Sequence, residues 1–186
     1  MNLNIKVAMA AFAVVLGSGC AIQAPVYTPS VESAELLKRQ SAPARVGAVT
    51  AAPGAPGAQS ISLRGSGMNS PVGADYGAYL SEALKAELKL AGKLDPESKV
   101  EIGGVLLKND IAAGGISTNS GEIEARFTVR RDGAVRYDKT QRVEASWESS
   151  FIGSVAIPKA QQQYPVLVQQ LLRQLFSDRA FFDAMR

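Results

Sequence analysis

The stretch Gly121–Trp147, GEIEARFTVRRDGAVRYDKTQRVEASW, carries the strongest structural signal in the chain. In its first half, apolar or small side chains stand at odd positions and charged or hydroxyl side chains at even ones, which is the period of a half-buried strand. Asp132-Gly133 separates it from a second segment in which Val143, Ala145 and Trp147 also fall on odd positions. The stretch therefore predicts an antiparallel hairpin with one buried face.

Parity favours one register for this hairpin. A two-residue loop at Asp132-Gly133 would set the apolar odd positions of one strand opposite even positions of the other. A three-residue loop with Gly133 in the left-handed conformation sets odd positions opposite odd ones, so apolar residues face apolar residues. We expect the second register, which gives the pairs Phe127–Tyr137, Val129–Val135, Glu122–Arg142 and Arg126–Asp138.

Outward from the hairpin, the flanking segments add helices and strands. Apolar residues recur at helical spacing in residues 75–91 and 159–176, and Asp178 can cap a last short helix. Residues 45–50 and 99–109 read as strands, the second with a bulge at Gly103-Gly104 that turns Val105 and Leu107 inward. The order predicts a two-layer α+β fold (β-α-β-β-β-α), with two helices packed on one face of an about four-stranded, mainly antiparallel sheet.

Two details of these segments bear on a site. In the helix over 75–91, Tyr76 and Tyr79 join the apolar stripe and are expected in the core, whereas Glu87 is expected among the solvated charges. The segment RGSGMNSPVG, residues 64–73, lacks the spacing and the GK[ST] ending of a phosphate loop, so we expect a mobile loop there.

Composition excludes several classes of function. The 186 residues contain no His and one Cys, so the usual soft-metal sites, His-dependent nucleophilic triads and an intramolecular disulfide are impossible. The net charge of +3 comes from scattered basic residues, which argues against nucleic-acid binding. The acidic pairs Glu122/Glu124 and Glu144/Glu148 are interpreted as solvated partners on a strand. We therefore expect no catalytic residues, no metal, no cofactor and no enzyme activity.

The N-terminus resembles a lipoprotein signal. An uncharged run of apolar or small residues, Val7–Gly19, is too short to span a bilayer and precedes Cys20. In the bacterial lipoprotein signal this cysteine is acylated and becomes the new N-terminus, and Ala21 after it resembles the outer-membrane class. Gly17 departs from the pattern, which places Leu three residues before the cysteine, so an ordinary secretory signal stays open. We expect a signal peptide at 1–19, a lipidated Cys20 with a flexible tether at 20–44, and one periplasmic α+β domain at 45–186.

A family resemblance follows from several of these segments together. The cysteine, the Pro-containing tether, LKLAGK, NDIAAGG, the hairpin and the closing LFSDRAFFDAM resemble the YajG-type family of bacterial lipoproteins from about Val46 onward. The order of elements is also similar to accessory lipoproteins of envelope lipid and lipopolysaccharide transport. Neither resemblance implies catalytic residues.

Two non-catalytic functions remain open. In the first, the chain is an outer-membrane-anchored scaffold or accessory subunit that faces the periplasm and binds an envelope protein through a strand edge or the loops around Gly114 and Met68. In the alternative, it is an auxiliary lipid-binding component of a lipid-transport system, with an apolar groove between helix and sheet. The first is preferred because the core consumes the apolar residues that such a groove would need.

Overall fold

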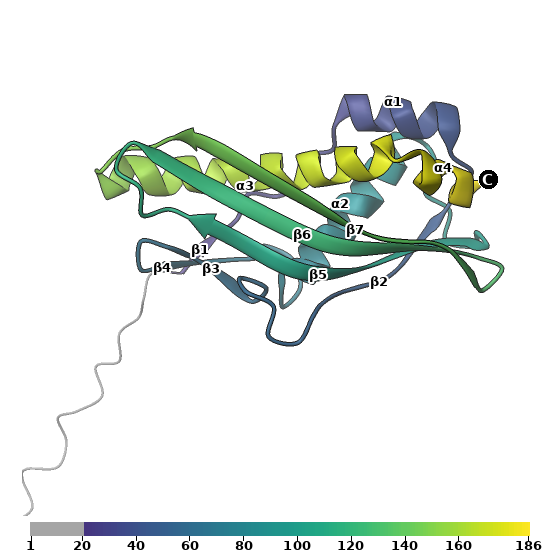
Figure 1. The fold of residues 1–186 in the computed structure, drawn as a ribbon, viewed down its shortest axis with the longest axis horizontal. Coiled ribbons are helices and arrows are strands. Elements are labelled where there is room, and N and C mark those ends of the chain that lie inside the picture. The colour runs from purple at the N-terminus through teal and green to yellow at the C-terminus, as the bar shows by residue number, and fades with distance from the viewer. Residues whose placement is uncertain (1–20) are drawn as a thin grey trace, which may run out of the picture.

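The structure, a computed structural model, describes residues 21–186 (Figure 1). Within these residues the main sheet has four strands in the order β2-β5-β6-β7, with β2 parallel to β5 and the other neighbours antiparallel. A smaller sheet has three strands in the order β1-β4-β3. The strands are β1 Ile22–Gln23, β2 Arg45–Ala51, β3 Ser60–Leu63, β4 Ser66–Asn69, β5 Val100–Ala112, β6 Thr118–Arg131 and β7 Ala134–Glu148.

Residues 21–186 also contain four helices, which are α1 Val31–Gln40, α2 Tyr76–Leu90, α3 Gly153–Ser177 and α4 Arg179–Met185. Helices α3 and α4 lie against β6 and β7, and α2 lies against β2. The buried apolar side chains of β6 are Ile123, Ala125, Phe127 and Val129, as its alternation predicts. The α+β class is confirmed. The layout of one sheet with two helices is wrong, because the small sheet and α1 add a second sheet and a further helix.

Residues 21–44 do not form the expected tether. Ile22 pairs with Met68 in β4, and the Ala24 N–H donates to the Asn69 carbonyl at 2.9 Å. Helix α1 then begins after Ser30, whose side chain accepts from the Ser33 N–H, and buries Ala34 and Leu37 on one face. The prolines of this segment therefore mark bends between short packed elements rather than an extended chain.

Strand β5 differs from the expected bulge. Its register shift lies between Leu106 and Lys108, and Leu106 is buried where Val105 and Leu107 were expected. Gly104 instead makes room for a neighbour, because a Cβ added there would lie 3.3 Å from Phe127 Cδ1. The glycine pair serves close packing across the sheet, which the sequence alone does not distinguish from a bulge.

The predicted register of the β6–β7 hairpin is wrong. Asp132 and Gly133 form a two-residue turn with φ of 49° and 80°, which are the left-handed values that a type I′ turn requires. After two pairs, Arg131–Ala134 and Arg130–Val135, a register shift sets odd positions opposite odd ones again, so Val129 opposes Tyr137 and Phe127 opposes Lys139. The bulge leaves Val135 half-exposed rather than paired with Val129.

Two other segments are more ordered than expected. Residues 64–69, where a mobile loop was expected, form the turn at Arg64-Gly65 and the second strand of the β3–β4 hairpin. Helix α3 begins at Gly153 rather than near Lys159, so Pro158 and Pro165 both lie inside it. The apolar stripe predicted for α3 is buried, including Tyr164, Leu167, Leu171 and Leu175.

Candidate functional site

The structure separates the residues that the sequence singled out. Cys20 lies outside the described residues, which begin at Ala21. Met68 is fully buried in β4, so it offers no docking loop. Gly114 lies in the exposed loop between β5 and β6. Around Met68, in residues 64–74, the exposed residues are therefore Gly65 of the turn and Gly73 and Ala74 beyond β4 rather than Met68 itself.

Two of the acidic residues that the sequence singled out, Glu122 and Glu144, form ion pairs with Lys or Arg side chains. Glu122 accepts from Lys108 Nζ at 2.6 Å and pairs with Arg142 Nε at 2.8 Å, and the hydrogen bond from Lys108 is the largest cause that lowers its pKa. Arg142 also pairs with Glu144. These contacts hold Glu122 ionised, so they favour the interpretation as cross-strand charge pairs.

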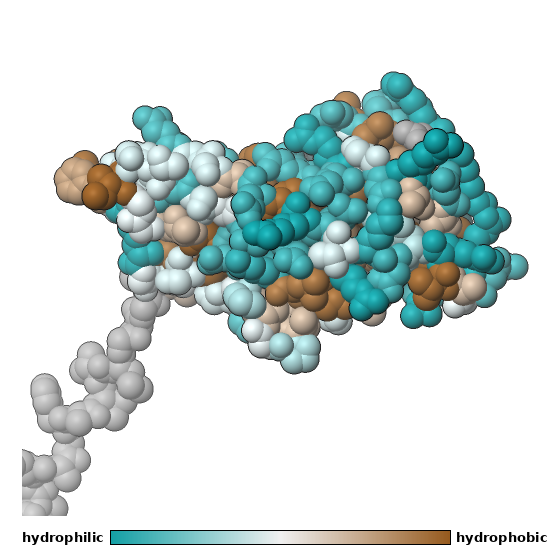
Figure 2. Space-filling view, in the orientation of Figure 1, coloured by the Kyte–Doolittle hydropathy of each residue, from teal (hydrophilic) through white to brown (hydrophobic). Residues whose placement is uncertain are grey.

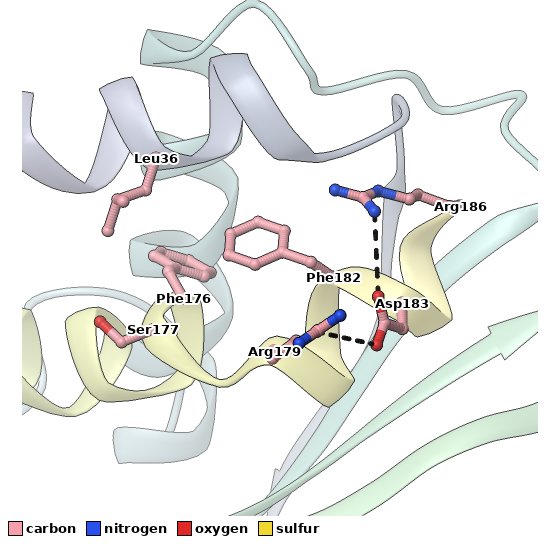
Figure 3. Close-up of a pocket in the computed structure, with 7 residues that line it drawn as sticks. All are labelled: Leu36, Phe176, Ser177, Arg179, Phe182, Asp183 and Arg186. Atoms are coloured by element: carbon pink, nitrogen blue, oxygen red, sulfur yellow. Dashed lines mark ion pairs between the residues drawn. The ribbon is translucent and has the colours of Figure 1, made fainter.

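A groove of about 480 Å³ lies between α1, α3 and α4 (Figure 3). Leu36 of α1, Phe176 at the end of α3 and Phe182 of α4 form its floor. The Phe182 ring packs edge-on against Phe181 at 5.5 Å between centroids, so the floor is braced by the aromatic core. The groove therefore has a fixed apolar base.

The rim of this groove is charged. Asp183 lies between the guanidinium groups of Arg179 and Arg186, at 3.9 Å from each (Figure 3). The Arg179 side chain is 95 % exposed, so its ion pair is screened and its donors face solvent. The site combines an apolar base with guanidinium donors suited to a carboxylate.

A buried acid lies beneath the N-terminal segment. Glu87 of α2 is fully buried, and its Oε1 accepts from the Tyr27 hydroxyl at 2.5 Å and the Ser30 N–H at 2.9 Å. Burial is the largest cause that raises the pKa of Glu87, against the effect of both hydrogen bonds. The expectation that Glu87 is solvated is wrong. Its helical spacing from the buried Ala83 was the signal that could have found it.

The tyrosines of α2 belong to the same interior. Tyr76 and Tyr79 are buried, as predicted, and both rings pack against Tyr164 of α3 at 4.9 and 5.2 Å between centroids. Desolvation raises the pKa of both hydroxyls. The Tyr76 hydroxyl donates to the Met68 carbonyl, and the Tyr79 hydroxyl to the Pro25 carbonyl. These side chains join α2, α3 and the small sheet rather than face a ligand.

A cluster of exposed apolar side chains lies at the end of the molecule where α3 begins. We call it the apolar tip, and it consists of Ile116, Phe151, Ile152 and Val155. Ile116 comes from the β5–β6 loop and is 76 % exposed, and Phe151 comes from the β7–α3 connection and is 73 % exposed. Apolar groups protrude at this end in Figure 2.

The described residues contain no group of three or more His, Cys, Asp or Glu placed to hold a metal ion. Over the same part of the chain, no helix combines the length with the apolar character needed to cross a bilayer.

Comparison with known proteins identifies a shared fold. No family model matches the sequence, and no curated protein matches it. Among solved structures, a Xanthomonas campestris protein of the family DUF330 is similar, with a TM-score of 0.54 and 15 % identity over 84 % of this chain and 94 % of that chain. This similarity shows the fold alone.

Two other solved structures give lower scores. A putative lipoprotein from Caulobacter crescentus has a TM-score of 0.47 and 12 % identity over 83 % of this chain and 98 % of that one. A minor lipoprotein from Acinetobacter baumannii has a TM-score of 0.40 and 14 % identity over 73 % of this chain and 92 % of that one.

Proposed function

We propose that the protein is a bacterial lipoprotein of YajG-like type, acylated at Cys20, that holds its domain at the periplasmic face of the outer membrane. There it acts as a non-catalytic accessory subunit, and it binds an envelope protein partner in the groove between α1, α3 and α4. The apolar run before Cys20 supports a lipoprotein signal. Two acyl chains on Cys20 would then give the stable membrane attachment that a single chain does not.

The observation that carries this proposal is that the described chain begins far from the groove along α3. The described chain enters at β1, near the start of α3, whereas the groove lies at the end of α3 (Figure 1). Helix α3 has 25 residues, which at 1.5 Å per residue separates the two ends by about 37 Å. A domain anchored at one end therefore presents the groove away from the bilayer, where a periplasmic protein can reach it.

The chemistry of the groove fits a protein segment better than a lipid. Phe176 and Phe182 are almost completely buried and Leu36 is partly exposed, so the base has apolar surface for a single side chain but not for the length of an acyl chain. Arg179 extends donors from the rim, and an apolar side chain beside an Asp or Glu of a partner would satisfy both parts of the site. We therefore expect an acidic, partly apolar segment as the occupant.

Photo-crosslinking in intact cells tests the groove. A photoreactive phenylalanine analogue replaces Leu36 or Arg179 in the full chain, and the control replaces Thr140, an exposed residue of β7 outside the groove. We expect one discrete protein adduct at Leu36 and Arg179 and none at Thr140. Loss of that adduct in an Arg179→Glu background supports recognition of an acidic segment.

Two results would overturn parts of this proposal. Phospholipid that co-purifies with the chain, without any protein adduct at the groove, would favour the alternative of an auxiliary lipid-binding component. Palmitate labelling that is unchanged in the Cys20→Ser variant would refute the anchor.

A further inference from the structure

The apolar tip is a rigid surface rather than a pair of loose loops. Arg64, in the β3–β4 turn, donates from Nη2 to the Gly115 and Ser150 carbonyls at 2.8 and 2.7 Å, and from Nη1 to the Phe151 carbonyl at 2.6 Å. Its Nε donates to the Ala113 carbonyl at 2.7 Å. One guanidinium therefore ties together the two loops that carry the tip, and its charge is directed at backbone oxygens.

The surroundings of the tip are almost free of charge. Residues 111–121 and 149–158, which include the tip loops, contain no Asp, Glu, Lys or Arg, and Arg64 is the one charged residue within 59–74. Charged side chains are frequent at the opposite end instead, around the β6–β7 turn, where Arg130, Arg131 and Asp132 follow one another. Glu148, which ends β7 beside these loops, pairs with Lys159 Nζ at 3.5 Å. Exposed Ile, Phe and Val on loops that carry no charged side chain match the headgroup boundary of a bilayer.

The chain enters the domain at this same end. Ile22 is paired in parallel with Met68, so the preceding residue, Ala21, lies level with Gly67. Gly67 is three residues from Arg64, about 10 Å along a strand. Cys20 is joined to Ala21 by one peptide bond, and consecutive Cα atoms are about 3.8 Å apart. An acyl anchor on Cys20 therefore holds this end of the domain against the membrane.

We propose that the apolar tip inserts into the lipid surface as a second contact beside the acyl anchor. This inference rests on the proposed lipidation of Cys20. Ile116, Phe151, Ile152 and Val155 enter the boundary between headgroups and acyl chains, and the Arg64 contacts keep the loops in the inserting arrangement. The two contacts together fix how the domain is oriented on the bilayer, with the groove directed into the periplasm.

Fluorescence quenching by lipid tests this orientation. Acylation occupies the single native cysteine, so a new cysteine labels at one place. The full acylated chain carries Ile152→Cys or, as a control of equal exposure (48 % for both parent side chains), Val135→Cys at the far end of β7. Each is labelled with a polarity-sensitive dye and reconstituted in phosphatidylethanolamine and phosphatidylglycerol vesicles that contain brominated lipid.

We expect a blue shift and a loss of emission with brominated lipid for Ile152→Cys, and neither change for Val135→Cys. If Ile152→Cys shows no quenching in a chain that incorporates palmitate, insertion of the apolar tip is overturned and the anchor is not. Equal quenching at both positions would overturn the orientation. A chain that incorporates no palmitate at Cys20 would overturn the anchor and this inference with it.

Discussion

At the scale of single residues, Glu87 is the position where burial and hydrogen bonding oppose each other. Its Oε1 holds Tyr27 and Ser30 against α2, while its Oε2 is buried without a partner among the described residues. Burial raises the pKa above the ordinary value, so the folded chain binds this proton more tightly than the unfolded chain does. The resulting stability is complete at acid pH and is lost as pH rises through the folded pKa.

The variant Glu87→Gln separates this charge effect from the hydrogen bonds. Gln keeps an acceptor for Tyr27 and Ser30 but does not ionise, so we expect its free energy of unfolding to rise relative to the parent protein between about pH 4 and pH 8. Urea denaturation across that range measures the difference. The control Glu87→Ala removes the acceptor and is expected to lose about 1–3 kcal/mol. Identical pH profiles for Gln and Glu would contradict the raised pKa.

At the scale of elements, the contact between α2 and β2 depends on one small residue. A Cβ added at Gly77 would lie 2.7 Å from the Thr50 carbonyl carbon and 2.8 Å from the Ala51 nitrogen. Both atoms belong to the backbone of β2, so they cannot rotate away. The glycine therefore sets how closely the helix approaches the sheet.

We expect Gly77→Ala to destabilise the protein although alanine favours helix. The gain in helix propensity is at most about 1 kcal/mol, whereas overpacking against backbone costs about 1–3 kcal/mol. Chemical denaturation measures the net loss. The control Gly114→Ala meets no atom within 4 Å and is expected to change stability by less than about 0.5 kcal/mol. A more stable Gly77→Ala would show that α2 can shift away from β2.

The sequence correctly predicted the elements in which apolar residues recur at a regular spacing. The alternation of β6 and the apolar stripes of α2 and α3 are repeated many times within each element, and the structure confirms them. The hairpin register failed because a bulge near Val135 depends on packing across the sheet. The charge pairs Glu122–Arg142 and Arg126–Asp138 still form, as diagonal contacts, because the observed register has the predicted parity.

The parts that the sequence did not predict are joined over long separations. Strand β1 has two residues, and its partner Met68 is 46 positions after Ile22, so no local period reveals it. The groove likewise combines Leu36 with Phe176 and Phe182 from the other end of the chain. Such sites arise from tertiary packing, which single-sequence periodicity does not report.

At the scale of the whole molecule, the packing of residues 21–44 brings the domain close to the proposed anchor. A tether of that length would let the domain move freely above the bilayer, whereas the structure offers one residue between Cys20 and β1. The orientation proposed for the tip and the groove requires this short connection.

Limited digestion with trypsin tests that packing. Lys38 and Arg39 of α1 have side chains that are 48 % and 75 % exposed, so only the helical backbone protects them. We expect the full chain in detergent to resist cleavage there. Leu37→Asp, which buries a charge beneath α1, should render both sites labile, and the control Val31→Asp, at a 71 % exposed position, should not. Rapid cleavage of the parent protein at these sites would contradict the packing and favour a flexible tether over residues 21–44.

Under the proposed lipidation, the start of β1 at Ile22 also determines the order of processing at Cys20 and folding of the small sheet. In that case, the enzymes that acylate Cys20 and cut the preceding bond would need unpaired chain on both sides of it, whereas pairing of Ile22 leaves only Ala21 between Cys20 and β1. Under the proposed lipidation, maturation must therefore be finished before β1 joins β4. The last step of folding then takes place on a chain that is already attached to the membrane, so assembly of the small sheet reports that processing is complete.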